Sequence, residues 1–308
     1  MTHRVKITLT VILASFMLLS VAACGETVAE TIPAAAGAQT SAVDTGAVSE
    51  VTEASRVQTN DTLSGSLTLT GSTSMADVAT ALAKAFMAEN ADITVSVGGN
   101  GSGEGPTAVN DGTAQIGLLS RDLKEEENAA SFDKVIIGFD GIAVIVNSAS
   151  GVNTLTTEQV TKIFKGEITN WKEVGGVDTV IQCIGREAAS GTRGAFEELM
   201  GIKDVALYAE EQNSTGNVKQ AVSSNPSSIG YVSLSAVDDS VAAIKLDGVD
   251  PTEENVKSGD YTLQRPFVMI AKTGSTDALT TAFLDFVFSD AGMKIVADDG
   301  VVPNPARI

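Results

Sequence analysis

The amino-acid sequence predicts an α/β fold built mostly on parallel sheets. Strand patterns alternate with helical patterns along the chain, as they do in proteins assembled from strand–helix–strand units. The length of 308 residues and the hydrophobic content of 43% provide for a sizeable core. Length alone suggests one large domain or two medium ones.

The first ordered unit is expected to begin at "GSLTLTGSTSM", residues 65–75. Leu67 and Leu69 alternate with threonines, which is typical of a strand, and Gly71 ends the pattern. Apolar residues from Met75 to Phe86 then recur at helical spacing. The order strand, turn, helix repeats in residues 92–112 and 179–200.

Later segments extend the alternation. Residues 156–166 begin with Thr156-x-x-Gln159, a capping-box pattern that predicts a helix start. Residues 277–300 predict one long amphipathic helix or two. Apolar segments predict further strands at 114–123, at 133–148 (two apolar runs), and at 228–234, 241–246 and 265–272.

Residues 1–23 are expected to be a lipoprotein signal peptide. A basic segment precedes an apolar run, and the run ends in "VAAC", which resembles a bacterial lipobox. Cleavage before Cys24 would leave the Cys24 thiol carrying lipid such as palmitate; an ordinary secretory signal cut near Ala23 is the alternative. Residues 24–62, rich in Ala, Thr and Ser, predict a lipid-anchored disordered tether.

Composition excludes several classes of function. The net charge of −19 argues against nucleic acid and against anionic membrane surfaces as partners. The only histidine is His3, inside the expected signal, so His-dependent nucleophilic catalysis and His-based metal sites are excluded. No metal and no cofactor are expected. Cys183, in the apolar run "VIQCI", is interpreted as a buried strand residue.

Three turns share one chemistry. The segments "GSTS" (71–74), "GNGSGEG" (99–105) and "REAASGTR" (186–193) each precede an expected helix. A helix start offers free backbone N–H groups, glycine permits close approach, and Ser/Thr hydroxyls add donors for an oxyanion. One such turn is weak evidence, because Ser and Thr are ordinary N-caps. Three turns, with Arg121 and Arg186 at strand ends, predict an anion-binding site.

The sequence resembles the substrate-binding lipoproteins of bacterial phosphate ABC importers, the PstS type. The segments that carry the resemblance span most of the chain from about residue 65: "GSTSM", "GSGEG", "QIGLLSRDL", "DGIAVIVN", "LTTEQVTKIFKGEITNWKEVGG", "IGREAASGTRGAFEEL", "IGYVSL" and "FLDFVFSDAGMKIV". The resemblance implies a two-lobe periplasmic-binding-protein fold of type II with two hinge crossovers, near "AVIVN" and "LQRPF". Lobe one would comprise 63–145 plus 264–308, and lobe two 146–263.

The resemblance also implies site residues. Matching motifs place bound phosphate against Thr73, Ser74, Ser102, Arg186, Ser190, Gly191 and Thr192. In "GLLSRDL", Ser120 stands where many family members carry an Asp that accepts the proton of hydrogen phosphate, and Arg121 is expected to supply a second cation. Asp140 is the expected acceptor, with Asp122 as the alternative; a turn or hinge role for Asp140 stays open.

The resemblance implies a binding protein without enzymatic activity or cofactor. It would bind inorganic phosphate, close about its hinge and present phosphate to the permease subunits of an ABC importer. A monomer is expected on the outer face of the cytoplasmic membrane, touching that membrane only through the lipid anchor. The alternatives are binding of another oxyanion such as sulfate or molybdate, a sensing or adhesion lipoprotein, and a phosphate-ester hydrolase, which would need a metal cluster or an activated nucleophile.

Three further features have expectations of their own. The run "EEE" (125–127) is expected to be solvated. Arg193 would either reach the anion or cap its helix. Arg265 is expected near a lobe crossover rather than in the site.

Overall fold

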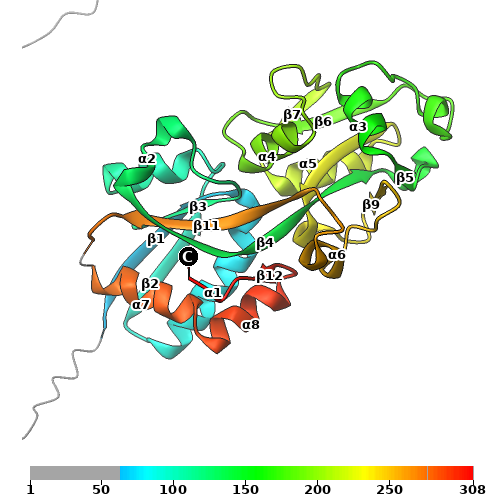
Figure 1. Ribbon diagram of the computed structural model, residues 1–308. Helices are drawn as coiled ribbons and strands as arrows, with labels where there is room; N and C mark the ends of the chain where they lie inside the picture. The colour runs from blue at the N-terminus through cyan, green and yellow to red at the C-terminus, as the bar shows by residue number, and fades with distance from the viewer. Residues whose placement is uncertain (1–62, 276, 308) are drawn as a thin grey trace, which may run out of the picture. The chain divides into compact units, whose positions relative to one another are not determined.

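The computed structural model describes residues 63–275 and 277–307. The predicted signal peptide, the tether and the lipid site at Cys24 therefore lie outside the described residues. Within them, strands and helices alternate as the sequence predicts (Figure 1). No helix in the described part of the chain is both long enough and apolar enough to cross a bilayer.

Strands are the scaffold of the described residues. They are β1 (Gly65–Gly71), β2 (Ile93–Gly98), β3 (Ile116–Leu119), β4 (Phe132–Val146), β5 (Thr154–Leu155), β6 (Gln182–Arg186), β7 (Glu210–Gln212), β8 (Ser228–Ser233), β9 (Ala242–Ala243), β10 (Lys245–Leu246), β11 (Gln264–Lys272) and β12 (Val302–Pro303).

Helices connect most of these strands. They are α1 (Ala76–Glu89), α2 (Glu104–Asp111), α3 (Thr157–Phe164), α4 (Gly191–Leu199), α5 (Thr215–Ser224), α6 (Glu253–Ser258), α7 (Ala278–Val287) and α8 (Asp290–Asp298). The capping box predicted at Thr156 and Gln159 is confirmed at the start of α3. The C-terminal helical pattern forms two helices, because Ser289 caps a new helix by accepting the backbone N–H of Gly292.

The main sheet has the strand order β2-β1-β3-β11-β4-β8-β6-β7. Pairs β1–β2, β1–β3, β6–β7 and β6–β8 are parallel, whereas β11 and β4 pair antiparallel with each other and with their other neighbours. The sheet is therefore mixed rather than mostly parallel, because the chain reverses direction on these two strands. The two apolar runs expected within 133–148 form one strand, β4.

Strand β4 joins two groups of elements (Figure 1). Its residues 132–141 pair with β11, and its residues 142–146 pair with β8. Strand β11 begins opposite the change of partner, with Gln264 beside Gly141 and Arg265 beside Asp140. Both strands that carry the chain from one group to the other are thus hydrogen-bonded to each other at that point.

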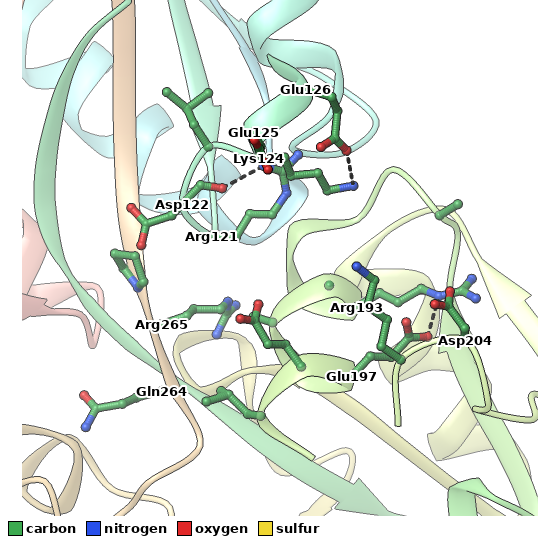
Figure 2. A pocket seen from close by; sticks show the side chains of 18 residues that line it. Arg121, Asp122, Lys124, Glu125, Glu126, Arg193, Glu197, Asp204, Gln264 and Arg265 are labelled. Carbon is green, nitrogen blue, oxygen red and sulfur yellow. Dashed lines mark hydrogen bonds and ion pairs between the residues drawn. The ribbon is translucent and has the colours of Figure 1, made fainter. Parts of the chain in front are cut away.

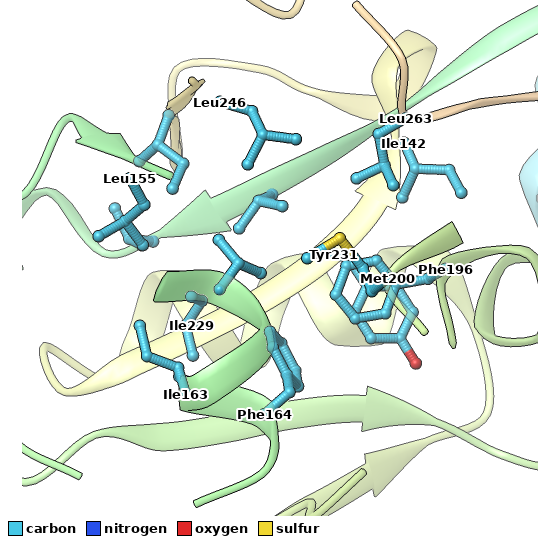
Figure 3. Close-up of a cluster of buried hydrophobic side chains, with 14 of the residues drawn as sticks. Ile142, Leu155, Ile163, Phe164, Phe196, Met200, Ile229, Tyr231, Leu246 and Leu263 are labelled. Atoms are coloured by element: carbon cyan, nitrogen blue, oxygen red, sulfur yellow. The ribbon is translucent and has the colours of Figure 1, made fainter. Parts of the chain in front are cut away.

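The largest apolar clusters lie on either side of this point. Core A gathers buried side chains only from residues 67–137 and 267–301. Core B gathers them only from residues 142–263, and Figure 3 shows part of it around Phe196 and Tyr231. These two rings stack with centroids 4.0 Å apart. Burial of such clusters supplies most of the stabilisation of a fold of this kind.

Candidate anion-binding site

The three predicted turns lie where strands end and helices start. The first follows β1 and leads into α1 through a short 3-10 helix, Thr73–Met75; the second links β2 to α2, and the third links β6 to α4. The first two turns pack closely, because Gly101 donates its N–H to Gly71 O at 2.9 Å. A Cβ at Gly99, whose φ is 124°, would lie 2.2 Å from Gly71 N, so glycine is required there.

Four hydroxyls form a hydrogen-bonded series that we call the hydroxyl chain: Thr73, Ser74, Thr192 and Thr215. Ser74 Oγ lies 2.8 Å from Thr192 Oγ1 and 2.9 Å from Thr215 Oγ1, and Thr73 Oγ1 lies 3.3 Å from Thr215 Oγ1. The hydroxyl chain joins the first turn to the starts of α4 and α5. Side chains separated by more than 100 positions therefore meet in one polar cluster.

The second turn contacts the start of α4 through Ser102. Ser102 Oγ accepts the backbone N–H of Ser120 at 3.0 Å and lies 3.3 Å from Ser120 Oγ. Both serines are buried, and a Cβ at Gly191 would lie only 2.2 Å from Ser102 Oγ. The start of α4 is thus packed directly against these two hydroxyls.

Arg186 is a buried cation beside the hydroxyl chain. Its Nη1 donates to Thr215 Oγ1 at 3.3 Å, while Nε and Nη2 donate to the Glu187 carboxylate at 3.0 and 2.9 Å. Its backbone N–H donates to Tyr231 Oη at 3.3 Å. Guanidinium groups bind carboxylates and phosphates through this planar, two-point geometry, so Glu187 fixes the orientation of Arg186.

The start of α4 supplies backbone donors. Ser190 is the N-cap, and its Oγ accepts the N–H of Arg193 at 3.2 Å. The N–H groups of Gly191 and Thr192 belong to the first turn of the helix, which has no intrahelical acceptors for them. They carry the partial positive charge of the helix start, which favours an anion.

Arg121, the expected second cation, is hydrogen-bonded to Glu127 and not to the hydroxyl chain. Its guanidinium donates two hydrogen bonds to Glu127, at 2.8 and 2.6 Å, and lines a groove of about 790 Å³ next to the hydroxyl chain (Figure 2). The expectation of a solvated "EEE" run is therefore wrong for Glu127. Burial raises the pKa of Glu127, but the hydrogen bond from Arg121 and its charge outweigh burial and hold that pKa below its usual value.

Asp140 is buried and bound by other residues. Its Oδ2 lies 2.7 Å from Arg265 Nη1 and accepts Ser233 Oγ–H at 2.6 Å, while Oδ1 accepts the N–H of Ser235 at 3.3 Å. Burial raises the pKa of Asp140, and the Arg265 charge and these donors oppose the rise. Asp140 has no hydrogen bond to the hydroxyl chain, and its role as proton acceptor stays a prediction. Asp122 forms an exposed ion pair with Lys134 at 3.0 Å.

Sequence reasoning missed two residues at this site. Arg265 lies on a strand that carries the chain between the two groups of elements, as expected, but it also donates from Nη2 to Thr192 Oγ1 at 3.3 Å. Thr215 contacts three members of the cluster, and no role was expected for it. A signal for Thr215 exists: Ser214, Thr215 and Gly216 are a fourth Ser/Thr/Gly segment at the start of a helix.

Arg193 stabilises the third turn through a hydrogen bond to the backbone of Arg186. Its guanidinium binds Glu197 at 2.8 Å, Glu211 at 2.9 Å and the carbonyl oxygen of Arg186 at 2.7 Å. It makes no hydrogen bond to the hydroxyl chain. The geometry corresponds to the capping alternative more than to direct contact with an anion.

The cluster offers donors rather than a metal site. No group of three His, Cys, Asp or Glu side chains within residues 63–275 and 277–307 has a metal-binding arrangement. Cys183 is buried in β6, and burial raises the pKa of its thiol to about 12. Hydroxyls, guanidinium groups and a helix start together suit a tetrahedral oxyanion.

Comparison with known proteins identifies a family. Residues 56–291 match the family described as the PBP superfamily domain. The phosphate-binding protein PstS of Bacillus subtilis is 34% identical over 97% of this chain and 94% of its own length. PstS of Pseudomonas aeruginosa is 30% identical over 80% of this chain and 85% of its own length.

Solved structures agree with the sequence relatives. A substrate-binding protein of a phosphate ABC transporter from Clostridium perfringens, crystallised with bound phosphate, has a TM-score of 0.76 and 40% identity over 78% of this chain and 100% of its own. An ABC-type phosphate transport receptor from Vibrio cholerae has a TM-score of 0.65 and 38% identity over 77% of this chain and 100% of its own.

Proposed function

This chain belongs to the PBP superfamily and, within it, to the PstS family of phosphate-binding proteins, and from that membership we propose that it binds inorganic phosphate outside the cytoplasm for an ABC importer. It acts by binding, not by catalysis. The observation that carries the proposal is the hydroxyl chain, in which Ser74 joins Thr192 and Thr215 at 2.8 and 2.9 Å. These hydroxyls lie beside a buried guanidinium and a helix start, which is the donor set a phosphate needs.

Binding would exchange contacts within the cluster for contacts to phosphate. The hydroxyls now hydrogen-bond to one another, and each can turn its hydrogen toward a ligand oxygen instead. Arg186 and the N–H groups of Gly191 and Thr192 would face the phosphate charge. Each hydrogen bond to a charged group contributes about 1.5–3 kcal/mol, so a few of them account for tight binding.

Two lobes closing on phosphate would account for the position of the site. Core A lies within lobe one, 63–145 plus 264–308, and core B lies within lobe two, 146–263, apart from Ile142 and Val144 of β4. Strands β4 and β11 would act as the hinge. Two contacts bridge the two sets of residues: the hydroxyl chain, and the hydrogen bond from Gly103 N–H to Ala189 O at 3.0 Å. Closure of the lobes would form these contacts.

The membrane anchor and the partners complete the proposal. A lipid on Cys24 would hold a monomer at the outer face of the cytoplasmic membrane, within reach of the importer's permease subunits. Replacing Cys24→Ser should abolish the incorporation of labelled palmitate into the protein. A variant that still incorporates the label would contradict lipid attachment at Cys24.

Calorimetric titration of the purified protein, freed of bound anion, tests the proposal. Phosphate should bind one to one at pH 7 while sulfate gives no heat, and Arg186→Gln should weaken phosphate binding by at least about tenfold. A protein silent toward phosphate would overturn the proposed function.

Sulfate or molybdate is the second candidate ligand class. It is favoured by one observation: no carboxylate among the described residues hydrogen-bonds to the hydroxyl chain. Hydrogen phosphate donates a proton and gains from an acceptor, whereas sulfate has no proton to donate. Sulfate binding as tight as phosphate binding would support this candidate and would also contradict Asp140 as the acceptor.

A further inference from the structure

Arg265 is a second buried cation at the hydroxyl chain. Its side chain is 2% exposed and extends from β11 toward the helix that carries Arg193 (Figure 2). Asp140 lies opposite it in the sheet register and pairs with its Nη1 at 2.7 Å. Nη1 also donates to Gly141 O at 3.1 Å, so this side of the guanidinium is saturated by the protein.

The other side of the guanidinium is incompletely bound. Nη2 donates to Thr192 Oγ1 at 3.3 Å, and Nε is buried with no acceptor among the described residues. A buried donor without a partner costs about 1–3 kcal/mol, and more when the group is charged. Such a group is expected to have its partner in a ligand or a bound water.

Two guanidinium groups therefore stand at the ends of one hydrogen-bonded series. Arg186 donates to Thr215, Thr215 is bonded to Ser74, Ser74 to Thr192, and Thr192 accepts from Arg265. Each arginine is bound on its far side by a carboxylate, Glu187 for one and Asp140 for the other.

The hydroxyl chain has at least one O–H hydrogen left to donate to a ligand. The four hydroxyls of the hydroxyl chain share three contacts, so at least one O–H has no acceptor within it. Both arginines add N–H groups directed inward. A site with an O–H free to donate and two fixed cations matches a ligand that carries two negative charges.

Resting on the proposed function, we propose that Arg265 is a second guanidinium ligand of the bound anion, held in position by Asp140. The arginine would bind one phosphate oxygen from the β11 side while Arg186 binds from the β6 side. Asp140 acts as a positioning residue, because it contacts Arg265 and not the hydroxyl chain. The ion pair would then serve binding, since a buried ion pair is weak evidence for stability by itself.

The test replaces the ion pair without leaving a lone buried charge. The double variant Arg265→Met with Asp140→Leu keeps volume and removes both charges, a change that folded proteins often tolerate. Its phosphate affinity should fall by about 10- to 100-fold, the equivalent of one charged hydrogen bond. The loss should be larger for the dianion, above the second ionisation of phosphate, than for the monoanion below it.

A second variant and a control separate the explanations. Arg265→Lys keeps the charge and the fold but loses the planar fork, so it should lose affinity while keeping the wild-type preference for the dianion over the monoanion. The control is Arg307→Met with Asp285→Leu, which removes an exposed ion pair away from the site and should bind like the wild type.

The outcomes are distinct. If the wild type binds phosphate and the Arg265 variants bind phosphate with the same affinity, this inference is overturned and the proposed function stands. An equal loss for both phosphate charge states in the double variant would also overturn it, because loss of structure alone predicts no charge dependence. A wild-type protein that does not bind phosphate would overturn the proposed function itself.

Discussion

Asp299 is a carboxylate in an unfavourable place. Its Oδ2 is buried without a hydrogen-bond partner among the described residues, and it ends α8 near two other carboxylates, Asp77 and Asp140. Burial, with the charges of these two residues, raises the pKa of Asp299 to about 6. The folded state therefore favours the protonated form more than the unfolded state does.

The consequence is a loss of stability as pH rises. The folded protein binds more protons than the unfolded chain between about pH 4 and about pH 6, so the Asp299 contribution is present below pH 4 and lost above pH 6. Asp299→Asn should remove this dependence and raise the free energy of unfolding at pH 7 by about 1 kcal/mol, a value reduced for partial exposure.

Denaturant unfolding at a series of pH values measures the effect. Asp92→Asn is the matched control, because it makes the same substitution at an exposed aspartate. Identical pH profiles for Asp299→Asn and the wild type would show that Asp299 titrates normally in the folded protein.

Single residues of the site differ in how far the sequence predicts them. Ser190 and Thr192 belong to one turn. The N-cap role of Ser190 is a local interaction that the residue type at that position predicts. The contact of Arg265 with Thr192 joins residues 73 positions apart and depends on the register of β11 against β4. Nothing in the sequence near Arg265 specifies that register, so its contact could not be predicted.

At the scale of elements, the start of α4 depends on a glycine. A Cβ at Gly191 would lie 2.2 Å from Ser102 Oγ and 2.7 Å from Ser120 Oγ, so any larger residue would push the second turn away. One turn further on, a Cβ at Gly194 would meet nothing nearer than Arg121 Cδ at 3.8 Å. The two glycines of one helix thus form a matched pair for experiment.

Gly191→Ala should impair the closing of the protein on phosphate without destabilising the fold. Alanine favours a helix more than glycine does, so the helix itself should not be weakened. Overpacking against Ser102 and Ser120 should lower phosphate affinity by at least about tenfold, measured by calorimetry, with little change in the thermal unfolding midpoint. Gly194→Ala should bind like the wild type. Equal affinities for both variants would mean that α4 does not need to approach these serines.

Element boundaries show where sequence patterns fall short. The glycines within 133–148 divided the apolar pattern into two runs, yet β4 is continuous through Gly138 and Gly141. Both positions are glycine because packing leaves little room for a side chain. A Cβ at Gly138 would lie 2.6 Å from Val302 O, and one at Gly141 would lie 3.0 Å from Val256 Cγ2. Such contacts are made by residues more than 100 positions away, so a local pattern cannot reveal them.

At the scale of the whole molecule, an acidic protein must attract an anion. The formal net charge is −19, and a field of that sign repels a phosphate dianion at distances beyond contact. The groove next to the hydroxyl chain does not reverse the sign, because its lining has five basic and six acidic side chains: Arg121, Lys124, Arg193, Lys203 and Arg265 against Asp122, Glu125, Glu126, Glu197, Glu198 and Asp204.

Salt should therefore accelerate binding. At physiological ionic strength, screening acts beyond about 8 Å, so it weakens the repulsive field of the surface more than the donors that touch the ligand. The association rate constant for phosphate should rise several-fold between low salt and physiological salt, while the dissociation rate constant changes less. Stopped-flow mixing at a series of ionic strengths, with an inert salt whose anion does not compete, measures both constants. A rate that falls with salt would mean that Arg121, Arg193 and their neighbours steer phosphate despite the net charge, and that the local field of the groove governs entry.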